Sequence, residues 1–239
     1  MEPKIYMPQE SGVHNRDLKK SVARLDKGKS YRDLSTVIIV PTRGGRSLTP
    51  RWVQCMQGLM KPMNQMVMGP VYVAGMEVGD AYNWAVEWIQ NNIPSAKFML
   101  TWEDDVLPPP DGLLKLYEAT DQYDCVQALY WTKGEEGQPM IYGDVNDPKV
   151  NFRPQPPIPD AVQRCYGLGM GFNLFKMDQF KKSPKPWFVT SQKWDPATGV
   201  SCMTQDLYYF ERAGKLGLRF AVDNRVKAGH YDCDADIVW

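Results

Sequence analysis

The sequence predicts an α/β fold: a single domain with a mostly parallel central sheet flanked by helices. Three observations predict this class. Short apolar runs alternate with longer stretches of helical periodicity over the first half of the chain. Proline, glycine or acidic residues end the apolar runs, as expected for short buried strands. The chain has 239 residues, 43% of them hydrophobic, enough to bury one large core. Such an alternation is typical of an open sheet with helices on both faces.

The first half is expected to alternate between strands and helices. The strands are predicted within 35–45, 68–76, 96–102 and 123–131, and the helices within 51–61, 79–93 and 109–123. The first strand, in STVIIVPTRGG, is a β-branched run that Pro41 and two glycines bring to an end. In the 79–93 helix, five apolar residues share one face: Ala81, Trp84, Ala85, Trp88 and Ile89. Pro110 and Asp111 suit the opening of the 109–123 helix.

The second half has a different composition. Residues 133–161 are rich in Pro, Gly and charge, and FRPQPPIPD is expected to form an extended wall. Glycines in YGLGMGFNLFKMDQF lead into an apolar segment and a helix, and their spacing is not that of a dinucleotide fingerprint. A long polar loop over 182–202 carries Trp187 and Trp194, which either stack on a ligand or pack the loop down. A helix over 204–218 and a strand within 219–231 complete the prediction.

Composition narrows the class of protein. There are 28 basic and 28 acidic residues, so no global basic field points to nucleic acid or membrane, although the segment Lys19–Arg32 is locally basic. Five scattered cysteines without a CxxC pair favour reduced thiols over a zinc ribbon or disulfide scaffold. The longest apolar run, Val37–Val40, is far short of a membrane span. Without an apolar leader at the N-terminus, a soluble, cytoplasmic protein is expected, with residues 1–34 as an N-terminal arm.

The strand predicted over 96–102 is followed at once by three carboxylates, Glu103, Asp104 and Asp105. A solvated turn that caps the next helix would explain them equally well on composition alone. Two features favour a site: the strand is apolar enough to be central, and prolines stiffen the loop that follows. Ligands of open α/β sheets bind beyond the carboxyl ends of the strands. Carboxylates held there suit Mg²⁺ or Mn²⁺, bound together with substrate phosphates.

Two further residues have both a structural and a chemical interpretation. His230 follows the last predicted strand, where it is either an ordinary polar residue near the C-terminus or a further ligand for the same metal. Asp206 begins the 204–218 helix, where it either complements the helix dipole or takes a proton from an attacking hydroxyl. Position alone does not choose between these interpretations.

Five stretches occur in this order: VIIVPTRGG, GDAYNWAVEWI, FMLTWEDDVLPPPDGLLKL, YGLGMGFNLFKMDQF and TQDLYYFERAGKLGLRFAVDNRVKAGHY. Together they resemble the GT-A class of nucleotide-sugar glycosyltransferases, particularly its family-2-like group. The resemblance covers roughly Thr36 to Tyr231. It implies a Rossmann-like GT-A domain over 35–239, with a nucleotide-sugar-binding half at 35–132 and an acceptor-binding half at 133–239.

The resemblance also implies roles for individual residues. Asp105 matches the last acid of the DxD motif, the main metal ligand, and Glu103 stands in place of the first acid. Asp104 is expected nearer the ribose, and His230 matches a C-terminal metal ligand. Asp206 matches the catalytic base, although Gln205 replaces the Glu that often precedes it. The remaining matches are to nucleotide-contacting positions at Pro41, Thr42, Arg43 and Asn83, and to an acid after the second strand at Glu77 or Asp80.

The function implied is metal-dependent transfer of a sugar from a UDP- or GDP-sugar to an acceptor hydroxyl, with Mn²⁺ or Mg²⁺ neutralising the diphosphate. The acceptor is a glycan, a protein or a hydroxymethylated DNA base. If Asp206 is the base, the anomeric centre is inverted; otherwise it is retained. Two alternatives remain: a nucleotidyltransferase that releases pyrophosphate from a nucleoside triphosphate, and a nucleotide- or sugar-binding module with a decayed site. The sequence does not indicate an oligomeric state.

Overall fold

The computed structural model describes residues 32–42, 48–147, 149–197 and 199–239. Leu34–Trp239 form one compact unit. The predicted N-terminal arm lies outside the described residues except for its last three, and so does Arg43. No helix in the described part of the chain is long and apolar enough to cross a membrane.

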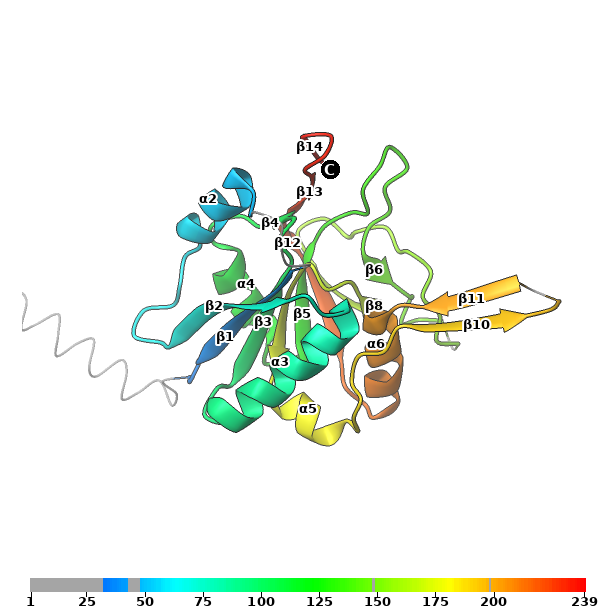
Figure 1. The fold of residues 1–239 in the computed structure, drawn as a ribbon, viewed down its shortest axis with the longest axis horizontal. Coiled ribbons are helices and arrows are strands. Elements are labelled where there is room, and N and C mark those ends of the chain that lie inside the picture. The colour runs from blue at the N-terminus through cyan, green and yellow to red at the C-terminus, as the bar shows by residue number, and fades with distance from the viewer. Residues whose placement is uncertain (1–31, 43–47, 148, 198) are drawn as a thin grey trace, which may run out of the picture. The chain divides into compact units, whose positions relative to one another are not determined.

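Helices and strands alternate along the first half, as predicted (Figure 1). The helices are α2 (Pro50–Gly58), α3 (Val78–Asn92), α4 (Gly112–Ala119), α5 (Asp178–Lys182) and α6 (Gln205–Lys215). The strands are β1 (Thr36–Thr42), β2 (Val67–Ala74), β3 (Phe98–Trp102), β4 (Val106–Leu107), β5 (Cys125–Leu129), β6 (Ile141–Tyr142), β7 (Val162–Cys165), β8 (Gly167–Leu168), β9 (Phe172–Lys176), β10 (Ser191–Asp195), β11 (Gly199–Met203), β12 (Phe220–Lys227), β13 (Gly229–Asp232) and β14 (Ile237–Val238).

The central sheet has seven strands in the order β2-β1-β3-β9-β5-β12-β7. Strand β1 is parallel to both β2 and β3, and β5 is parallel to β12. Strand β9 is antiparallel to its neighbours β3 and β5, and β7 is antiparallel to β12. Five of the seven strands therefore point the same way, and the predicted α/β class with a mostly parallel sheet is confirmed.

Side chains of the central strands are buried on both faces of the sheet. In β1, Val37 and Ile39 contribute to the core under α3 and α6. The alternate residues Ile38 and Val40 contribute to the core under α2 and α4. Because both faces are covered, the strand is a continuous β-branched run without polar alternation. This explains why the sequence pattern identified it.

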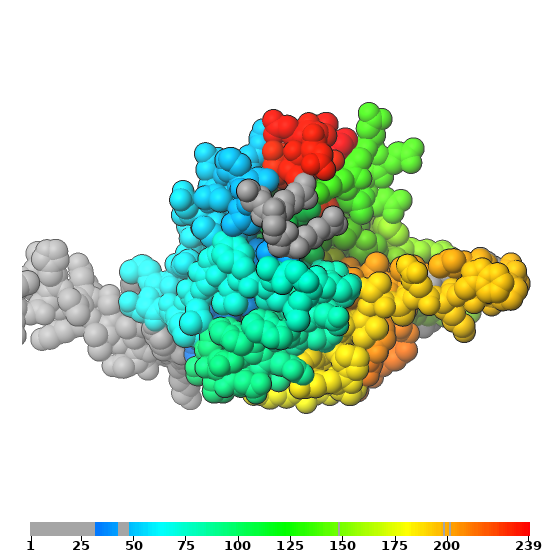
Figure 2. All heavy atoms as spheres, viewed as in Figure 1, coloured from blue at the N-terminus to red at the C-terminus, as the bar shows by residue number. Residues whose placement is uncertain are grey.

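The sequence analysis did not predict several strands of the second half, among them β9 and the hairpin β10–β11. The segment after the glycine run is β9, which inserts between β3 and β5 in the middle of the sheet. The predicted polar loop contains the hairpin β10–β11, which projects from the body of the molecule (Figures 1 and 2). Trp194 pairs with Val200 across this hairpin, and both side chains are mostly exposed. Trp187 is instead buried and donates its indole N–H to the Phe180 and Ser183 carbonyls.

Candidate functional site

The ends of β1 and β3 lie side by side at one edge of the sheet. The two strands are parallel and pair from Thr36 with Phe98 to Ile39 with Thr101. A cavity of about 430 Å³ opens at this edge, a size typical of a small-ligand site. Its lining residues come from the end of β1, the loops after β2 and β3 and the starts of α3 and α6: Pro41, Thr42, Met76, Glu77, Val78, Glu103, Asp104, Asp105 and Gln205.

Glu77 lies at the N-terminus of α3 and forms part of the cavity wall. Its Oε2 accepts hydrogen bonds from the backbone N–H groups of Gly79 (2.7 Å) and Asp80 (3.2 Å), so that it caps the helix. Its Oε1 accepts from the Thr190 hydroxyl at 2.9 Å, which attaches the base of the β10–β11 hairpin to the cavity rim. Of the two acids considered after the second strand, Glu77 lines the cavity and Asp80 is a first-turn residue of α3.

Glu103 is held on three sides. Its backbone N–H donates to the Gly171 carbonyl at 2.9 Å, and its carbonyl accepts from Nε1 of Trp52 at 3.0 Å. Its carboxylate Oε1 accepts from the Tyr82 hydroxyl at 3.2 Å. Burial and, to a lesser extent, the nearby carboxylates of Asp105 and Asp206 together raise the pKa of Glu103 to about 7. The Glu103 carboxyl group is therefore held in one position and titrates near neutral pH.

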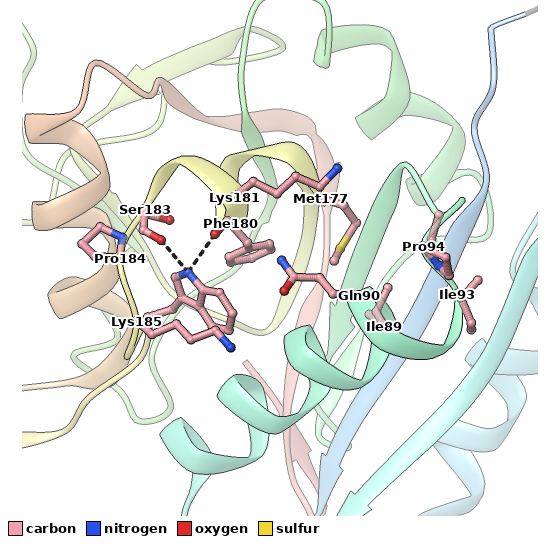
Figure 3. Close-up of a pocket in the computed structure, with 12 residues that line it drawn as sticks. Ile89, Gln90, Ile93, Pro94, Met177, Phe180, Lys181, Ser183, Pro184 and Lys185 are labelled. Atoms are coloured by element: carbon pink, nitrogen blue, oxygen red, sulfur yellow. Dashed lines mark hydrogen bonds between the residues drawn. The ribbon is translucent and has the colours of Figure 1, made fainter.

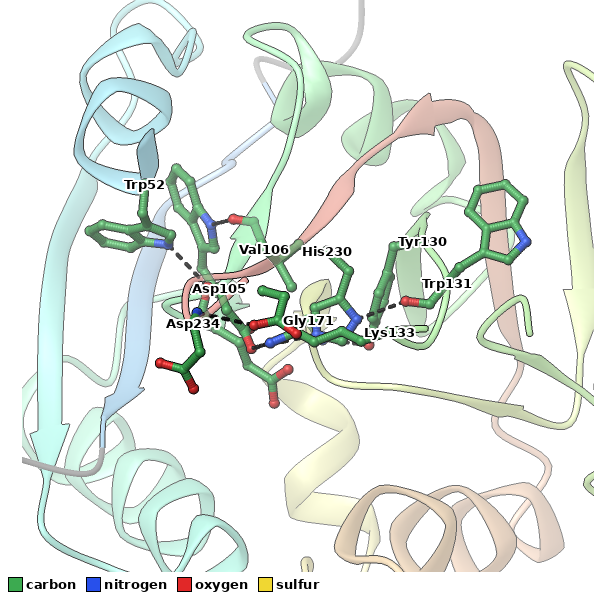
Figure 4. A network of polar contacts seen from close by, with 12 residues as sticks. Trp52, Asp105, Val106, Tyr130, Trp131, Lys133, Gly171, His230 and Asp234 are labelled. Carbon is green, nitrogen blue, oxygen red and sulfur yellow. Dashed lines mark hydrogen bonds and ion pairs between the residues drawn. The ribbon is translucent and has the colours of Figure 1, made fainter. Parts of the chain in front are cut away.

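Asp105 lies between two cationic or potentially cationic side chains (Figure 4). Its Oδ2 is 2.7 Å from Nζ of Lys133 and 3.5 Å from Nε2 of His230. Burial raises the pKa of Asp105, but the hydrogen bonds from His230 and Lys133 lower it by more, so that the net pKa lies below its ordinary value. The carboxylate is ionised at neutral pH and faces an imidazole.

His230 reaches Asp105 because β13 pairs antiparallel with the short strand β4, which follows the acidic loop. His230 lies opposite Val106, and the Tyr231 N–H donates to the Asp105 carbonyl at 2.7 Å. Nδ1 of His230 is 2.7 Å from the Trp131 carbonyl oxygen. A carbonyl can only accept, so Nδ1 carries the proton and Nε2 presents its lone pair toward Asp105 when the ring is neutral.

The donor set of Asp105 and His230 suits a divalent cation. One carboxylate oxygen and one imidazole nitrogen converge, and the second ring nitrogen is fixed by a carbonyl, as is usual for metal-binding histidines. The third expected ligand, Glu103, accepts a hydrogen bond from the Tyr82 hydroxyl on one of its two carboxylate oxygens, Oε1. Among the residues that the structure describes, no three His, Cys, Asp or Glu side chains form a metal-binding group. Mg²⁺ and Mn²⁺ sites that use one or two protein ligands are completed by substrate phosphates.

Asp206 is buried in the first turn of α6. Its Oδ1 accepts from the Leu207 N–H at 2.9 Å, and only 8% of the residue is exposed. Burial raises the pKa of Asp206 above its ordinary value, against the lowering effect of its hydrogen bonds. The neighbouring Gln205 lines the cavity, and the Asp206 charge raises the pKa of Glu103. Asp206 is thus the sequence neighbour of a lining residue and is not itself among the residues that line the cavity.

Of the described residues expected near the nucleotide, three line the cavity and one does not. Pro41, Thr42 and Asp104 line the cavity. Asn83 does not: its Nδ2 donates to the Phe188 carbonyl at 2.7 Å, and its Oδ1 accepts from the N–H groups of Trp187 (2.9 Å) and Phe188 (3.1 Å). All of this side chain's hydrogen-bonding groups thus hold the segment that precedes the β10–β11 hairpin.

The glycines of the GLGMGF run make room for a side chain. A Cβ at Gly171 would lie 2.8 Å from Cζ of Tyr130, and a Cβ at Gly169 would overlap the Tyr130 hydroxyl. That hydroxyl accepts from the Gly171 N–H at 2.9 Å, and the Tyr130 ring packs edge-on against the His230 ring with centroids 5.5 Å apart. The glycines therefore leave the space in which Tyr130 packs against His230.

Three contributors escaped the sequence analysis: Lys133, Tyr82 and Trp52. Lys133 had a usable signal, since it follows the strand predicted over 123–131 and so leaves the sheet at the edge where the acids lie. Tyr82 and Trp52 had none, because nothing local shows which atoms their polar groups meet across the fold.

A second and larger cavity, of about 530 Å³, lies at the opposite edge of the sheet (Figure 3). It is formed by the end of α3, the residues before β3 and the α5 region, with Ile89, Phe180 and Trp187 on its apolar side. None of the described residues that line it is an acid or a histidine. These lining residues therefore provide no anionic ligand for a metal ion bound together with a phosphate.

No protein-family model matches this chain, and neither does any curated protein sequence. The chain is similar in structure to A197 from STIV, with a TM-score of 0.59 and 16% sequence identity. The alignment covers 85% of this chain and 92% of A197, so the two share a fold over nearly their whole length.

Two other solved structures are more distant. The inositol-1-phosphate CTP transferase from T. maritima aligns with a TM-score of 0.44 at 13% identity, over 87% of this chain and 93% of that chain. TarS from S. aureus aligns with a TM-score of 0.46 at 12% identity, over 81% of this chain and 36% of that chain. At these TM-scores neither similarity bears on function, which has to be argued from the site.

Proposed function

We propose that this chain is a glycosyltransferase that moves a sugar from a nucleotide-diphosphate donor, a UDP- or GDP-sugar, to an acceptor hydroxyl with the help of Mn²⁺ or Mg²⁺. The observation that carries the proposal is the meeting of Asp105 and His230 beside a ligand-sized cavity at the carboxyl edge of the sheet. Open α/β sheets bind nucleotides at this edge. A carboxylate and an imidazole alone leave coordination positions for a diphosphate.

Five of the lining residues, together with His230, have a role in this proposal. Pro41 and Thr42 border the nucleotide, and Asp104 lies nearer the ribose. Asp105 and His230 hold the cation, which when bound neutralises charge on the departing diphosphate. Glu103, which Tyr82 and Trp52 fix in place, is the further acid proposed beside the cation.

Asp206 is the base of the proposed reaction. The acceptor oxygen attacks the anomeric carbon, the bond from that carbon to the diphosphate oxygen breaks, and its electron pair leaves with the nucleoside diphosphate. The acceptor's proton passes to the Asp206 carboxylate, whose raised pKa suits proton uptake. Attack from the side opposite the leaving group inverts the anomeric centre.

The acceptor is a hydroxyl of a glycan, a protein or a hydroxymethylated DNA base. These acceptors differ in charge, so the salt dependence of acceptor binding distinguishes them. Binding of a DNA acceptor weakens steeply as the salt concentration rises, because binding releases counterions from the DNA. A neutral glycan acceptor shows little change over the same range.

A turnover assay tests the proposal. The wild-type protein, incubated with Mn²⁺ and a panel of UDP- and GDP-sugars, is expected to release the nucleoside diphosphate slowly to water and faster with an acceptor. Both Asp206→Asn and Asp105→Asn are expected to slow release strongly, Asp206→Asn by about 10²- to 10⁴-fold. Release of pyrophosphate from a nucleoside triphosphate would identify a nucleotidyltransferase instead. Nucleotide binding without turnover of any donor would identify a binding module.

A further inference from the structure

Lys133 and His230 both approach the same oxygen of Asp105. Nζ of Lys133 is 2.7 Å from Oδ2, and Nε2 of His230 is 3.5 Å from the same atom (Figure 4). A cation bound between Asp105 and His230 through Oδ2 would lie close to the ammonium group that now contacts this oxygen. Two cations cannot share that position, because their repulsion is weakly screened between partly buried side chains.

The loop that carries Lys133 is closed by its own hydrogen bonds. The Thr132 N–H donates to the Gln138 carbonyl at 2.9 Å, and the Gln138 N–H donates to the Thr132 hydroxyl at 2.8 Å. Gly134 turns the chain with a φ of 107°, a conformation that favours glycine. Trp131, two residues before Lys133, supplies the carbonyl that orients His230. One short segment therefore fixes the metal-facing imidazole and anchors the lysine beside it.

The cavity itself is rich in negative charge. Four carboxylates line it, those of Glu77, Glu103, Asp104 and Asp105. A diphosphate entering this cavity needs cations close to its oxygens. The Lys133 side chain is 32% exposed. Its ammonium group is carried on a flexible stem, so it can turn from Asp105 to a phosphate without moving the loop.

We infer that Lys133 is a positioning residue that occupies Asp105 in the absence of metal and turns to the donor's diphosphate once a divalent cation takes its place. The inference rests on the proposed function and extends it. It gives the lysine two measurable and opposite effects: Lys133 weakens metal binding to the nucleotide-free protein and strengthens diphosphate binding to the metal-loaded protein.

The first effect is tested by calorimetric titration of Mn²⁺ into the nucleotide-free protein. Lys133→Met is expected to bind Mn²⁺ about 1.5-fold to fivefold more tightly than wild type, the range expected from a partly exposed ion pair. Lys133→Arg, which keeps a cation on the loop, is expected to stay close to wild type. Lys181→Met is the matched control, since it removes a lysine that pairs with Asp178 far from the cavity. A merely structural role for Lys133 would not tighten metal binding.

The second effect is tested by titrating UDP and GDP into the same proteins at saturating Mn²⁺. Lys133→Met is expected to weaken binding of the preferred nucleotide by roughly 10- to 100-fold, as for loss of a charge-assisted hydrogen bond. The inference is overturned if Lys133→Met leaves either affinity at the wild-type and Lys181→Met values. Asp105→Asn separates this failure from that of the proposed function. If Asp105→Asn loses metal-dependent nucleotide binding and Lys133→Met changes nothing, only the inference fails. If wild type binds neither metal nor nucleotide, both fail.

Discussion

Oδ2 of Asp105 and Nε2 of His230 lie 3.5 Å apart, although one residue follows β3 and the other comes from the penultimate strand. The contact depends on a two-residue antiparallel pairing between β13 and β4. The chain end fastens this pairing, since His230 and Trp239 exchange backbone hydrogen bonds of 2.9 and 3.0 Å. The C-terminal segment therefore supplies half of the proposed metal site.

His230→Gln is expected to weaken Mn²⁺ binding by at least roughly tenfold, because even a residue that only orients a metal ligand is typically worth 10- to 100-fold. Calorimetric titration of Mn²⁺ measures this directly. Tyr231→Phe is the control on the same strand: it removes a hydroxyl that bonds Asp236 and is expected to leave Mn²⁺ affinity unchanged. Equal losses in the two variants would mean that β13, and not the imidazole, is responsible.

Asp206→Asn is expected to lower the rate of sugar transfer by about 10²- to 10⁴-fold, the usual contribution of a general base. Asparagine keeps an oxygen that can accept from the Leu207 N–H, so the start of α6 is preserved. Nucleotide affinity is therefore expected to stay at the wild-type value. Transfer at the wild-type rate would show that Asp206 only caps the helix.

Glu103 makes the fold sensitive to pH. Its pKa is raised from 4.5 to about 7 in the folded protein, so the folded state holds a proton that the unfolded state has lost. Its stabilising contribution is complete below about pH 4.5 and is lost as pH rises through about 7. Wild type is therefore expected to lose about 1–3 kcal/mol more stability than Glu103→Gln across this window.

Urea unfolding at pH 5 and pH 8 in metal-free buffer checks this expectation. Glutamine keeps an oxygen for the Tyr82 hydroxyl, so the comparison isolates the titration. Glu87→Gln, which removes a surface glutamate paired with Lys185, is the control and is expected to follow wild type. Parallel pH profiles for Glu103→Gln and wild type would contradict the raised pKa.

Gly169→Ala is expected to destabilise the protein by about 1–3 kcal/mol, because the added methyl group overlaps the Tyr130 hydroxyl. In a Tyr130→Phe background the cost should be smaller, since the overlapping atom is absent. Gly58→Ala is the control, with no atom within 4 Å of its Cβ. Urea unfolding of the four proteins of this cycle measures the coupling. An unchanged cost in the Tyr130→Phe background would exclude the overlap as its cause.

Much of this fold could be predicted from the sequence because its central strands are buried on both faces of the sheet. The β1 and β3 runs are apolar without alternation, and parallel pairing brings their ends to one edge. That reasoning placed Glu103, Asp104 and Asp105 at the ligand-binding edge, and the family resemblance added Pro41 and Thr42. The structure brings these five residues together around one cavity. The role of the site stays a prediction.

What escaped prediction depends on contacts between distant segments. The sequence of β9 predicts only an apolar segment. Its place as an antiparallel strand between β3 and β5 depends on pairing with strands that are distant in sequence. Asn83 was matched to a nucleotide contact, but its amide holds the backbone of Phe188. Which partner a polar side chain meets is decided by tertiary packing and not by neighbours in sequence.

The most direct test of the proposed site is calorimetric titration of UDP and GDP into wild type and Asp105→Asn, each with Mn²⁺ and with a chelator. Wild type is expected to bind one of the two nucleotides, and to bind it more tightly with Mn²⁺. Asp105→Asn is expected to lose the metal-dependent part of that affinity. Absence of nucleotide binding by wild type, or equal Mn²⁺ enhancement in Asp105→Asn, would contradict a metal–diphosphate site at Asp105 and His230.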